Sequence, residues 1–355
     1  MIKVLIVDDS PFMRKILTDI IQEDKEIVVI GEARNGKEAL EKIPILNPDL
    51  ITLDVEMPIM DGITTLRHIV KKYKLPVIMI SSLTVEDAEL TIEALEKGAV
   101  DFIAKPKNIF NLSEETIKYE IIDKIKAGAQ SKTILKYKKT SKAEEIKEIK
   151  PIKGLTKSKP LDKKDYDYII SIGTSTGGPR ALQNVLPLIP KNINGTIVVV
   201  QHMPANFTKS LADRLNNQSN IIVKEGEDGE ILKRGYCYIA PGGYHMLVKK
   251  KAGEYIIELN QEPAIKGLRP SADILMESIS KLDDLKKIAI IMTGMGSDGS
   301  KGIVDIKNSN GYIMAQDEDT SVVFGMPKAA IETNVVDKIV SLENIAYEIT
   351  RLVEV

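Results

Sequence analysis

Two stretches in which short apolar runs alternate with helix-patterned segments constrain the fold most, and a lysine-rich stretch separates them. The separating stretch, Lys124–Lys164, holds 14 lysines and 4 acidic residues among its 41 residues, a local charge of +10. Such a composition cannot bury enough apolar surface to offset the chain entropy lost on folding. We interpret it as a linker with a transient helix at Ala143–Ile149. It serves either as a solvated tether or as a surface that meets an acidic partner.

Alternation of strands and helices predicts parallel sheets with helices on both faces. Before the linker we expect strands at Lys3–Val7, Val28–Ala33, Leu50–Leu53, Pro76–Ile80 and Asp101–Ala104. After it we expect strands at Tyr168–Ile172, Thr196–Gln201, Tyr238–Ala240, Lys287–Met292 and Gly311–Ala315. The fold class is therefore α/β, with a five-stranded parallel sheet at 1–122, a linker at 123–164 and a second, doubly wound Rossmann-like domain at 165–355.

Composition excludes several classes of protein. The formal net charge of −2 argues against nucleic-acid binding by the protein as a whole. The single cysteine, Cys237, rules out an internal disulfide framework and a cysteine-rich metal site. The N-terminus lacks a signal-peptide pattern, and no apolar run approaches the roughly 18 residues of a membrane span. We therefore expect a cytoplasmic protein that does not insert into a membrane.

Acidic side chains follow the expected strands of the first half. Chemistry gathers at the carboxyl ends of the strands in an open parallel sheet. There the chain places Asp8, Asp9, Asp54, Ser81 and Lys105. Three carboxylates suit a hard cation such as Mg²⁺, and a carboxylate beside that cation can accept a phosphoryl group. A lysine would neutralise the transferred oxygens. The first half therefore predicts a phosphorylation site.

In order and spacing these residues resemble the receiver domain of two-component response regulators, over about residues 1–122. The resemblance implies that Asp54 accepts a phosphoryl group from a histidine kinase. It also implies that Mg²⁺ binds Asp8, Asp9, Asp54 and the backbone carbonyl of Glu56, and that Ser81, Phe102 and Lys105 are the switch residues. Such a domain is a switch whose output lies further along the chain.

A serine lies on a glycine-rich turn at the start of the second half. The strand ending at Ile172 runs into Gly173–Arg180, in which Ser175 precedes a helix. Backbone N–H groups at a helix N-terminus stabilise anions, and the run satisfies the G-x-S-x-G pattern of hydrolase nucleophiles. The same turn also fits a nucleotide-phosphate cradle or plain tight packing.

A serine nucleophile needs a base and a group that orients the base. His202 ends the next strand, and Asp298 follows the strand that ends at Met292. The order Ser, His, Asp differs from that of α/β hydrolases, which would require His245 together with Asp213 or Asp228. Neither aspartate follows an obvious core strand, so we favour His202 and Asp298. His68 is interpreted as a surface residue, and the role of His245 stays open.

The segment Gly294–Gly299 supports a competing interpretation, a phospho-regulated nucleotide-binding module. It reads as G-x-G-x-x-G between a strand and the helical run Gly302–Asn308, and Asp317 lies where a ribose-binding acid is expected. The unit lacks a second mononucleotide-binding half, however, and it leaves Ser175 and His202 unexplained.

Five motifs together resemble the chemotaxis protein-glutamate methylesterase (CheB) family. They are Gly173–Gly178, Gln201–Pro204, Ala240–His245, Arg269–Asp273 and Thr293–Gly299. The resemblance implies a serine-type ester hydrolase in which Ser175 is the nucleophile, His202 the base and Asp298 the orienting carboxylate, with Thr176 and Met295 supporting the oxyanion.

The same resemblance implies a substrate and a setting. The substrate would be glutamate γ-methyl esters on chemoreceptors, with methanol released, and receptor glutamines would be deamidated by the same steps. Hydrolysis would be activated by phosphorylation and would need no cofactor beyond the Mg²⁺ of the receiver domain. The partners would be chemoreceptors and a chemotaxis histidine kinase.

Overall fold

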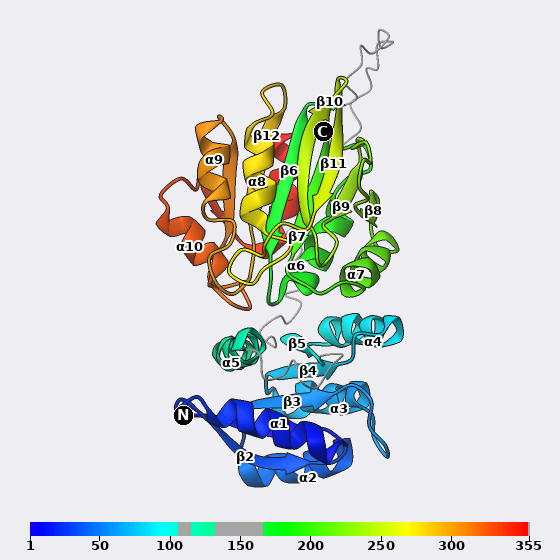
Figure 1. Ribbon diagram of the computed structural model, residues 1–355, viewed down its shortest axis with the longest axis vertical. Coiled ribbons are helices and arrows are strands. Elements are labelled where there is room, and N and C mark those ends of the chain that lie inside the picture. The colour runs from blue at the N-terminus through cyan, green and yellow to red at the C-terminus, as the bar shows by residue number, and fades with distance from the viewer. Residues whose placement is uncertain (106–114, 132–165, 354–355) are drawn as a thin grey trace, which may run out of the picture.

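A computed structural model describes residues 1–105, 115–131 and 166–353. Two α/β domains lie one above the other, and the N-terminal domain presents α4, β5 and α5 to the C-terminal domain (Figure 1). Within the described residues, no helix has the length and apolar character needed to cross a membrane. The predicted helix at 143–149 lies outside the described residues.

The N-terminal domain alternates five strands with five helices. Its elements are β1 (Ile2–Val7), α1 (Pro11–Gln22), β2 (Ile27–Ala33), α2 (Gly36–Leu46), β3 (Leu50–Asp54), α3 (Gly62–His68), β4 (Val77–Ser81), α4 (Val85–Glu96), β5 (Asp101–Ala104) and α5 (Glu115–Gln130). The strands form one parallel sheet in the order β2-β1-β3-β4-β5. Apolar side chains of α2, α3 and α4 cover one face, and those of α1 and α5 cover the other.

Helix starts in this domain follow capping chemistry. The side chains of Ser10, Asn35, Asp61 and Thr84 each accept the N–H of a residue three positions on, which satisfies a donor that the helix leaves free. Helix α3 is followed directly by a π-helical turn at Ile69–Tyr73. Helix α5 continues to Gln130, past the predicted domain boundary at 122, which itself stays a prediction.

The C-terminal domain has a larger parallel sheet. Its elements are β6 (Tyr168–Thr174), α6 (Gly178–Val185), a 3₁₀ turn (Leu186–Leu188), β7 (Gly195–Gln201), α7 (Phe207–Asn216), β8 (Ile222–Glu225), β9 (Tyr236–Ile239), β10 (His245–Lys251), β11 (Glu254–Asn260), α8 (Ala272–Ser280), β12 (Lys286–Ile291), α9 (Gly302–Asn308), β13 (Tyr312–Gln316), α10 (Met326–Glu332), β14 (Lys338–Val340) and α11 (Leu342–Leu352). The sheet order is β14-β13-β12-β6-β7-β9-β8, with every neighbouring pair parallel. The predicted α/β class and parallel sheets are confirmed.

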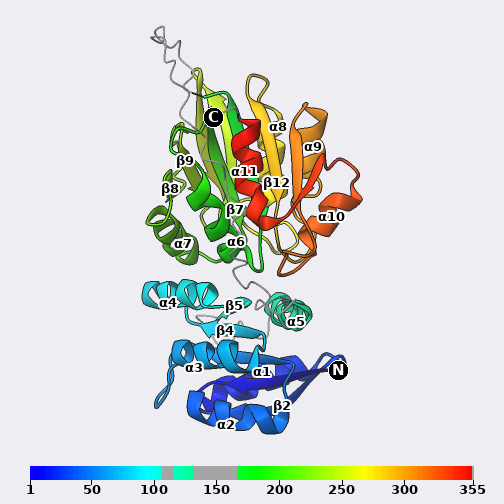
Figure 2. The same cartoon turned by 180° about the vertical axis from the view of Figure 1, so that it is seen from behind.

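The strand order reverses between β6 and β12. From β6 the sheet grows through β7 to β8, whereas from β12 it grows through β13 to β14. Helices α8 and α9 and the β10–β11 hairpin cover one face (Figure 1), and α6, α7 and α11 cover the other (Figure 2). The loops that leave β6 and β12 therefore diverge, and the crevice between them is where α/β proteins bind ligands.

Direct contacts hold the two domains together. The rings of Phe102 in β5 and Phe207 in α7 stack with centroids 4.5 Å apart, and both are buried. At the end of α4, Glu96 accepts hydrogen bonds from three residues of the C-terminal domain, Gln183, Arg214 and Gln218. The interface thus combines an apolar centre with a charged pair beside it.

Candidate active site and phosphorylation site

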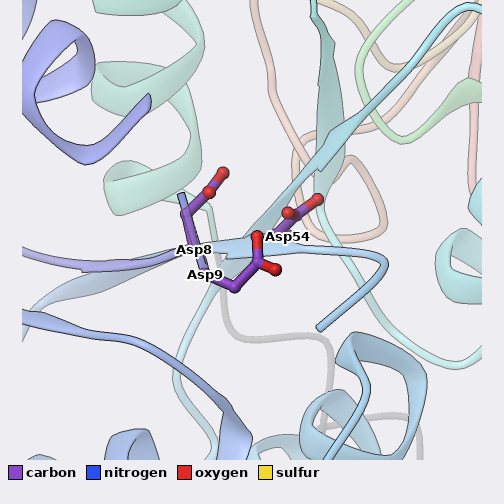
Figure 3. Close-up of side chains that lie close together, drawn as sticks. All are labelled: Asp8, Asp9 and Asp54. Carbon is purple, nitrogen blue, oxygen red and sulfur yellow. The ribbon is translucent and has the colours of Figure 1, made fainter. Parts of the chain in front are cut away.

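The predicted acidic residues of the N-terminal domain come together at the carboxyl ends of its strands. Asp8 and Asp9 follow β1 and Asp54 ends β3, so the sheet order sets the three carboxylates side by side (Figure 3). A ligand oxygen from each lies within 4.8 Å of the others. Lys105 donates a hydrogen bond of 2.7 Å to Asp54 Oδ2. A cavity of about 400 Å³ opens there, and Glu56 is among the residues that line it.

The charges in this pocket are poorly balanced by the protein alone. Burial, together with the negative charge of Asp8, raises the pKa of Asp54 to about 6, against the opposing effect of Lys105. Asp8 Oδ2 is buried and accepts no hydrogen bond, although Lys105 Nζ lies 3.4 Å away. An all-oxygen donor set with an unsatisfied carboxylate fits Mg²⁺, so these residues suit the predicted ion.

Two of the three predicted switch residues, Ser81 and Phe102, contact elements that lie at the domain interface (Figure 1). Ser81 Oγ accepts a 2.7 Å hydrogen bond from Thr91 Oγ1 of α4, and both groups are buried. Phe102 makes the stack with Phe207 described above. One switch residue is thus bonded to the helix that carries Glu96, and the other touches the catalytic domain directly.

Ser175 lies on the turn between β6 and α6, partly exposed to solvent. Gly177 makes this turn possible by taking a left-handed conformation with φ of 78°, which glycine adopts at no steric cost. Gly294, in the loop after β12, packs so closely that a Cβ there would lie 2.8 Å from Ser175 Cβ. The nucleophile candidate therefore lies at the reversal point of the sheet, between the two diverging loops.

His202 and Asp298 meet beside this turn, although 96 residues separate them. The Nε2–H of His202 donates to Asp298 Oδ2 at 2.7 Å, and both side chains are at least nine-tenths buried. Asp298 also accepts from Ser271 Oγ and from the N–H groups of Ala272 and Asp273 at the start of α8. Burial alone would raise the pKa of Asp298, but the hydrogen bonds from His202, Ser271 and Ala272 lower it to about 2.

The hydrogen bond to Asp298 decides which nitrogen of the His202 ring can act as a base. Since Nε2 donates to Asp298, Nδ1 is the nitrogen of His202 left to accept a proton. Throughout the described part of the chain, no hydrogen bond joins Ser175 Oγ to His202. Hydrogen bonds of this kind often tighten only once substrate is bound.

Two peptide groups near Ser175 each have a hydrogen-bonded carbonyl and, on the opposite side, an N–H group that makes no hydrogen bond among the described residues. The carbonyl of Ser175 accepts from Gly178 N and Gln201 Nε2, and the carbonyl of Gly294 accepts from Gly325 N and Met326 N. The N–H on the far side of each peptide belongs to Thr176 or Met295, and no hydrogen bond among the described residues uses either one. By contrast, the N–H of Ser175 donates to the Thr293 carbonyl at 3.0 Å. Thr176 and Met295 are thus the free donors.

The other two histidines lie apart from this pair. His68 is exposed at the end of α3. His245 is fully buried at the start of β10, where its Nε2 lies 3.3 Å from the Pro263 carbonyl and burial lowers its pKa. Neither aspartate considered for it is its partner, because Asp213 pairs with Lys209 and Asp228 accepts from Leu259 N.

The backbone donors at the helix start after the glycine-rich loop are already in use. The N–H groups of Lys301 and Gly302, which would bind a phosphate at this helix start, both donate to Asp273 Oδ1. Asp317, the candidate ribose-binding acid, accepts from the N–H and the hydroxyl of Thr320. The structure therefore offers no support for the nucleotide-binding alternative.

Comparison with known proteins decides the family. The CheB methylesterase model matches residues 170–349, and the response regulator receiver domain model matches residues 4–116. The chain belongs to the CheB methylesterase family. Its N-terminal domain is a response regulator receiver domain.

Relatives in this family match nearly the whole chain. A protein-glutamate methylesterase/protein-glutamine glutaminase of Halalkalibacterium halodurans is 48% identical over 99% of this chain and 98% of its own length. One of the same name from Bacillus subtilis is 48% identical over 100% of this chain and 99% of its own length. The solved CheB methylesterase catalytic domain of Thermotoga maritima covers 53% of this chain and 99% of its own, with 43% identity and a TM-score of 0.51.

Some residues of the site carried no assigned role in the sequence. Ser271 lies in the Arg269–Asp273 motif, whose composition gave no reason to link it to Asp298. Asp101, in the receiver domain, accepts a 2.5 Å hydrogen bond from the hydroxyl of Thr176, which is the residue after Ser175. Ser271 could have been suspected only because its motif occurs together with other motifs of the family. No sequence signal marks Asp101.

The receiver pocket gives a prediction about stability and metal. Replacing Asp54→Asn should raise the unfolding temperature of the metal-free chain at pH 7 by a few degrees. A carboxyl whose pKa is raised to about 6 in the fold loses stability as pH rises from about 4 through 6, which costs about 1 to 3 kcal/mol above pH 6. The gap between variant and wild type should therefore open over this pH range in calorimetry.

Magnesium supplies the control for that measurement. Adding Mg²⁺ should raise the unfolding temperature of the wild type, because the ion offsets the charge of Asp8, Asp9 and Asp54. The same addition should leave Asp54→Asn nearly unchanged. An equal response of both proteins to Mg²⁺, or a variant less stable than wild type at pH 7, would contradict this account of the pocket.

Proposed function

We propose that the chain hydrolyses γ-methyl esters of glutamate residues on chemoreceptors, releases methanol, and is activated by phosphorylation of Asp54. The observation that carries the proposal is the buried His202–Asp298 hydrogen bond beside the Ser175 turn, at the reversal point of the sheet. The relatives named protein-glutamate methylesterase/protein-glutamine glutaminase support it over the full length of the chain.

In the first step, Ser175 Oγ attacks the ester carbonyl while its proton passes to Nδ1 of His202. Asp298, ionised at neutral pH, stabilises the imidazolium and holds the ring in place. The N–H groups of Thr176 and Met295 stabilise the oxyanion, and each such donor contributes roughly 3 to 4 kcal/mol in other hydrolases. Collapse of the intermediate breaks the bond to the methoxy group, which leaves as methanol with the proton from His202.

Water completes the cycle. His202 Nδ1 removes a proton from water as its oxygen attacks the acyl-enzyme, and the resulting intermediate releases glutamate while Ser175 recovers its proton. A glutamine side chain passes through the same steps with ammonia as the leaving group. Its amide is the poorer electrophile, so we expect deamidation to be the slower reaction. The protein's own residues supply every proton transfer in both reactions.

The receiver domain regulates the esterase through the interface that it makes with the catalytic turn. Asp101 binds the hydroxyl of Thr176, which is 2% exposed, so β5 covers the residue next to the nucleophile. Ser175 itself stays partly exposed, so the docked receiver domain restricts, from the side of Thr176, the approach of a chemoreceptor segment to the turn. Regulation therefore requires that this contact loosen when Asp54 is phosphorylated.

Phosphorylation reaches the interface through Ser81. A histidine kinase supplies the phosphoryl group, and Mg²⁺ held by Asp8, Asp9, Asp54 and the Glu56 carbonyl would neutralise its oxygens. The new acceptor oxygens attract the Ser81 hydroxyl as a donor, and when the side chain turns toward them its oxygen moves away from the Thr91 hydroxyl that donates to it in the resting chain. Helix α4 is thereby released from the strand end, and Glu96 at its far end loses its fixed position against α7.

Removing the nucleophile tests the chemistry. Ser175→Ala should abolish methanol release from methylated chemoreceptor, because the other hydroxyls on the turn are buried and donate to the Thr293 carbonyl (Thr174) and to Asp101 (Thr176). The unfolding temperature should stay within a degree or two of wild type, since the Ser175 side chain makes no hydrogen bond within the described residues. Gas chromatography of methanol and calorimetry give the two readouts. A folded variant that releases methanol at the wild-type rate would overturn the assignment.

Breaking the interface tests the regulation. Glu96→Ala removes the acceptor for Gln183, Arg214 and Gln218, so basal methanol release without a phosphodonor should rise roughly 5- to 30-fold, as expected for a loss of about 1 to 2 kcal/mol of docking free energy. Glu86→Ala is the matched control, because Glu86 is exposed on the same helix. Basal activity that stays at the wild-type level in the folded Glu96 variant would contradict masking by the receiver.

A further inference from the structure

Thr293 lies where the three loops of the catalytic site meet. It follows β12 by two residues, is 1% exposed, and directly precedes Gly294 and Met295 of the oxyanion loop. The nucleophile turn after β6 lies on one side of it, and the segment after β13 lies on the other. A residue in this position can set how these loops are spaced.

The main-chain atoms of Thr293 fix the start of the nucleophile turn. Its carbonyl accepts from the Ser175 N–H at 3.0 Å and from Thr174 Oγ1 at 2.8 Å. Its own N–H donates to Gln316 Oε1 at 2.8 Å. These contacts tie β12 to Ser175 but use only main-chain atoms of Thr293, so they would survive replacement of its side chain.

The side chain of Thr293 makes a second, separate set of contacts. Its hydroxyl donates to the Thr176 carbonyl at 2.9 Å and accepts from Val323 N at 3.0 Å. One oxygen thus joins the residue after the nucleophile to the segment that precedes α10. Val323 also accepts the Gly294 N–H through its carbonyl, so the same segment holds the oxyanion loop.

These contacts bear on where the oxyanion donors lie. The Ser175 N–H is occupied by Thr293, which leaves the N–H groups of Thr176 and Met295 to bind the oxyanion. They belong to two different loops, so their spacing depends on a bridge between those loops. The Thr293 hydroxyl is such a bridge, because it holds Thr176 directly and Met295 through Val323 and Gly294.

We propose that Thr293 is a positioning residue for ester hydrolysis, which acts through its hydroxyl to hold the Thr176 and Met295 donors at the spacing that the oxyanion requires. This inference rests on the proposed esterase function. Donors of this kind contribute to the transition state more than to substrate binding. Loss of the hydroxyl should therefore lower kcat and leave KM nearly unchanged.

The test replaces the hydroxyl by a methyl group of similar size. In assays of methanol release with saturating phosphodonor and Mg²⁺, Thr293→Val should lower kcat roughly 10- to 100-fold, the range expected when catalytic groups are displaced without being removed. KM should stay within about 3-fold, and Thr293→Ser, which keeps the hydroxyl, should recover kcat to within about 3-fold of wild type.

Thr196→Val is the matched control. Thr196 lies in β7, and its hydroxyl is buried without a hydrogen-bond partner, so the same chemical change there should leave kcat at the wild-type value. Circular dichroism and calorimetry establish that each variant folds. If Thr293→Val does not fold, Thr293→Ala removes the hydroxyl without placing a methyl group against the Val323 N–H.

The outcomes separate this inference from the function on which it rests. If the wild-type chain releases no methanol, the proposed function is wrong, and this inference is wrong with it. Where the wild type is active, a folded Thr293→Val protein with wild-type kcat overturns the inference alone. So does a rise in KM at constant kcat, or a Thr293→Ser protein as impaired as Thr293→Val, because packing and not the hydroxyl would then explain the loss.

Discussion

The carboxylate of Asp298 is the constraint on which the catalytic domain depends. It is buried, yet it accepts hydrogen bonds from His202, Ser271 and the first N–H groups of α8, and these keep it ionised. Without those donors a carboxylate at this depth would be protonated and could not stabilise a charged histidine. The start of α8, the loop after β12 and the end of β7 must therefore meet at one point, which lies at the carboxyl end of β6, where the sheet order reverses.

The receiver domain shows a different use of buried charge. Asp8, Asp9 and Asp54 bring more negative charge into the pocket than Lys105 balances, and burial together with the charge of Asp8 raises the pKa of Asp54 to about 6. This imbalance suits a site that binds a cation and then a phosphoryl group. The same domain also places Asp101 on Thr176 and Phe102 on Phe207. The sheet of the receiver domain therefore carries the phosphorylation site at the carboxyl ends of its strands, and its last strand, β5, contacts the esterase domain.

Most of the site could be predicted from one general rule, that functional side chains lie at the carboxyl ends of parallel strands. The apolar runs located those ends, so Asp8, Asp54 and Lys105 in one domain, and His202 in the other, could be predicted to lie beside their partners. The meeting of His202 with Asp298 is the clearest case, because 96 residues separate them and the strands that they follow, β7 and β12, lie on either side of β6. The β10–β11 hairpin and α8, by contrast, were not predicted, since their local sequence pattern does not indicate where they pack against the sheet.

Contacts between loops and between domains could not be predicted, because they depend on packing and not on local pattern. The Thr176–Asp101 hydrogen bond and the Phe102–Phe207 stack require a docking geometry that no periodicity encodes. Thr293 looked like any threonine after a strand, and its role depends on Thr176 and Val323 arriving on either side of it.

The central claim is that this chain is a methylesterase whose active site the receiver domain controls. The most direct measurement is the rate of methanol release from methylated chemoreceptor by the full-length wild-type protein, with and without a phosphodonor and Mg²⁺. The account predicts slow release from the resting chain and a clear acceleration once Asp54 is phosphorylated. No methanol in either state would contradict the esterase assignment, and equal rates in the two states would contradict control by the receiver.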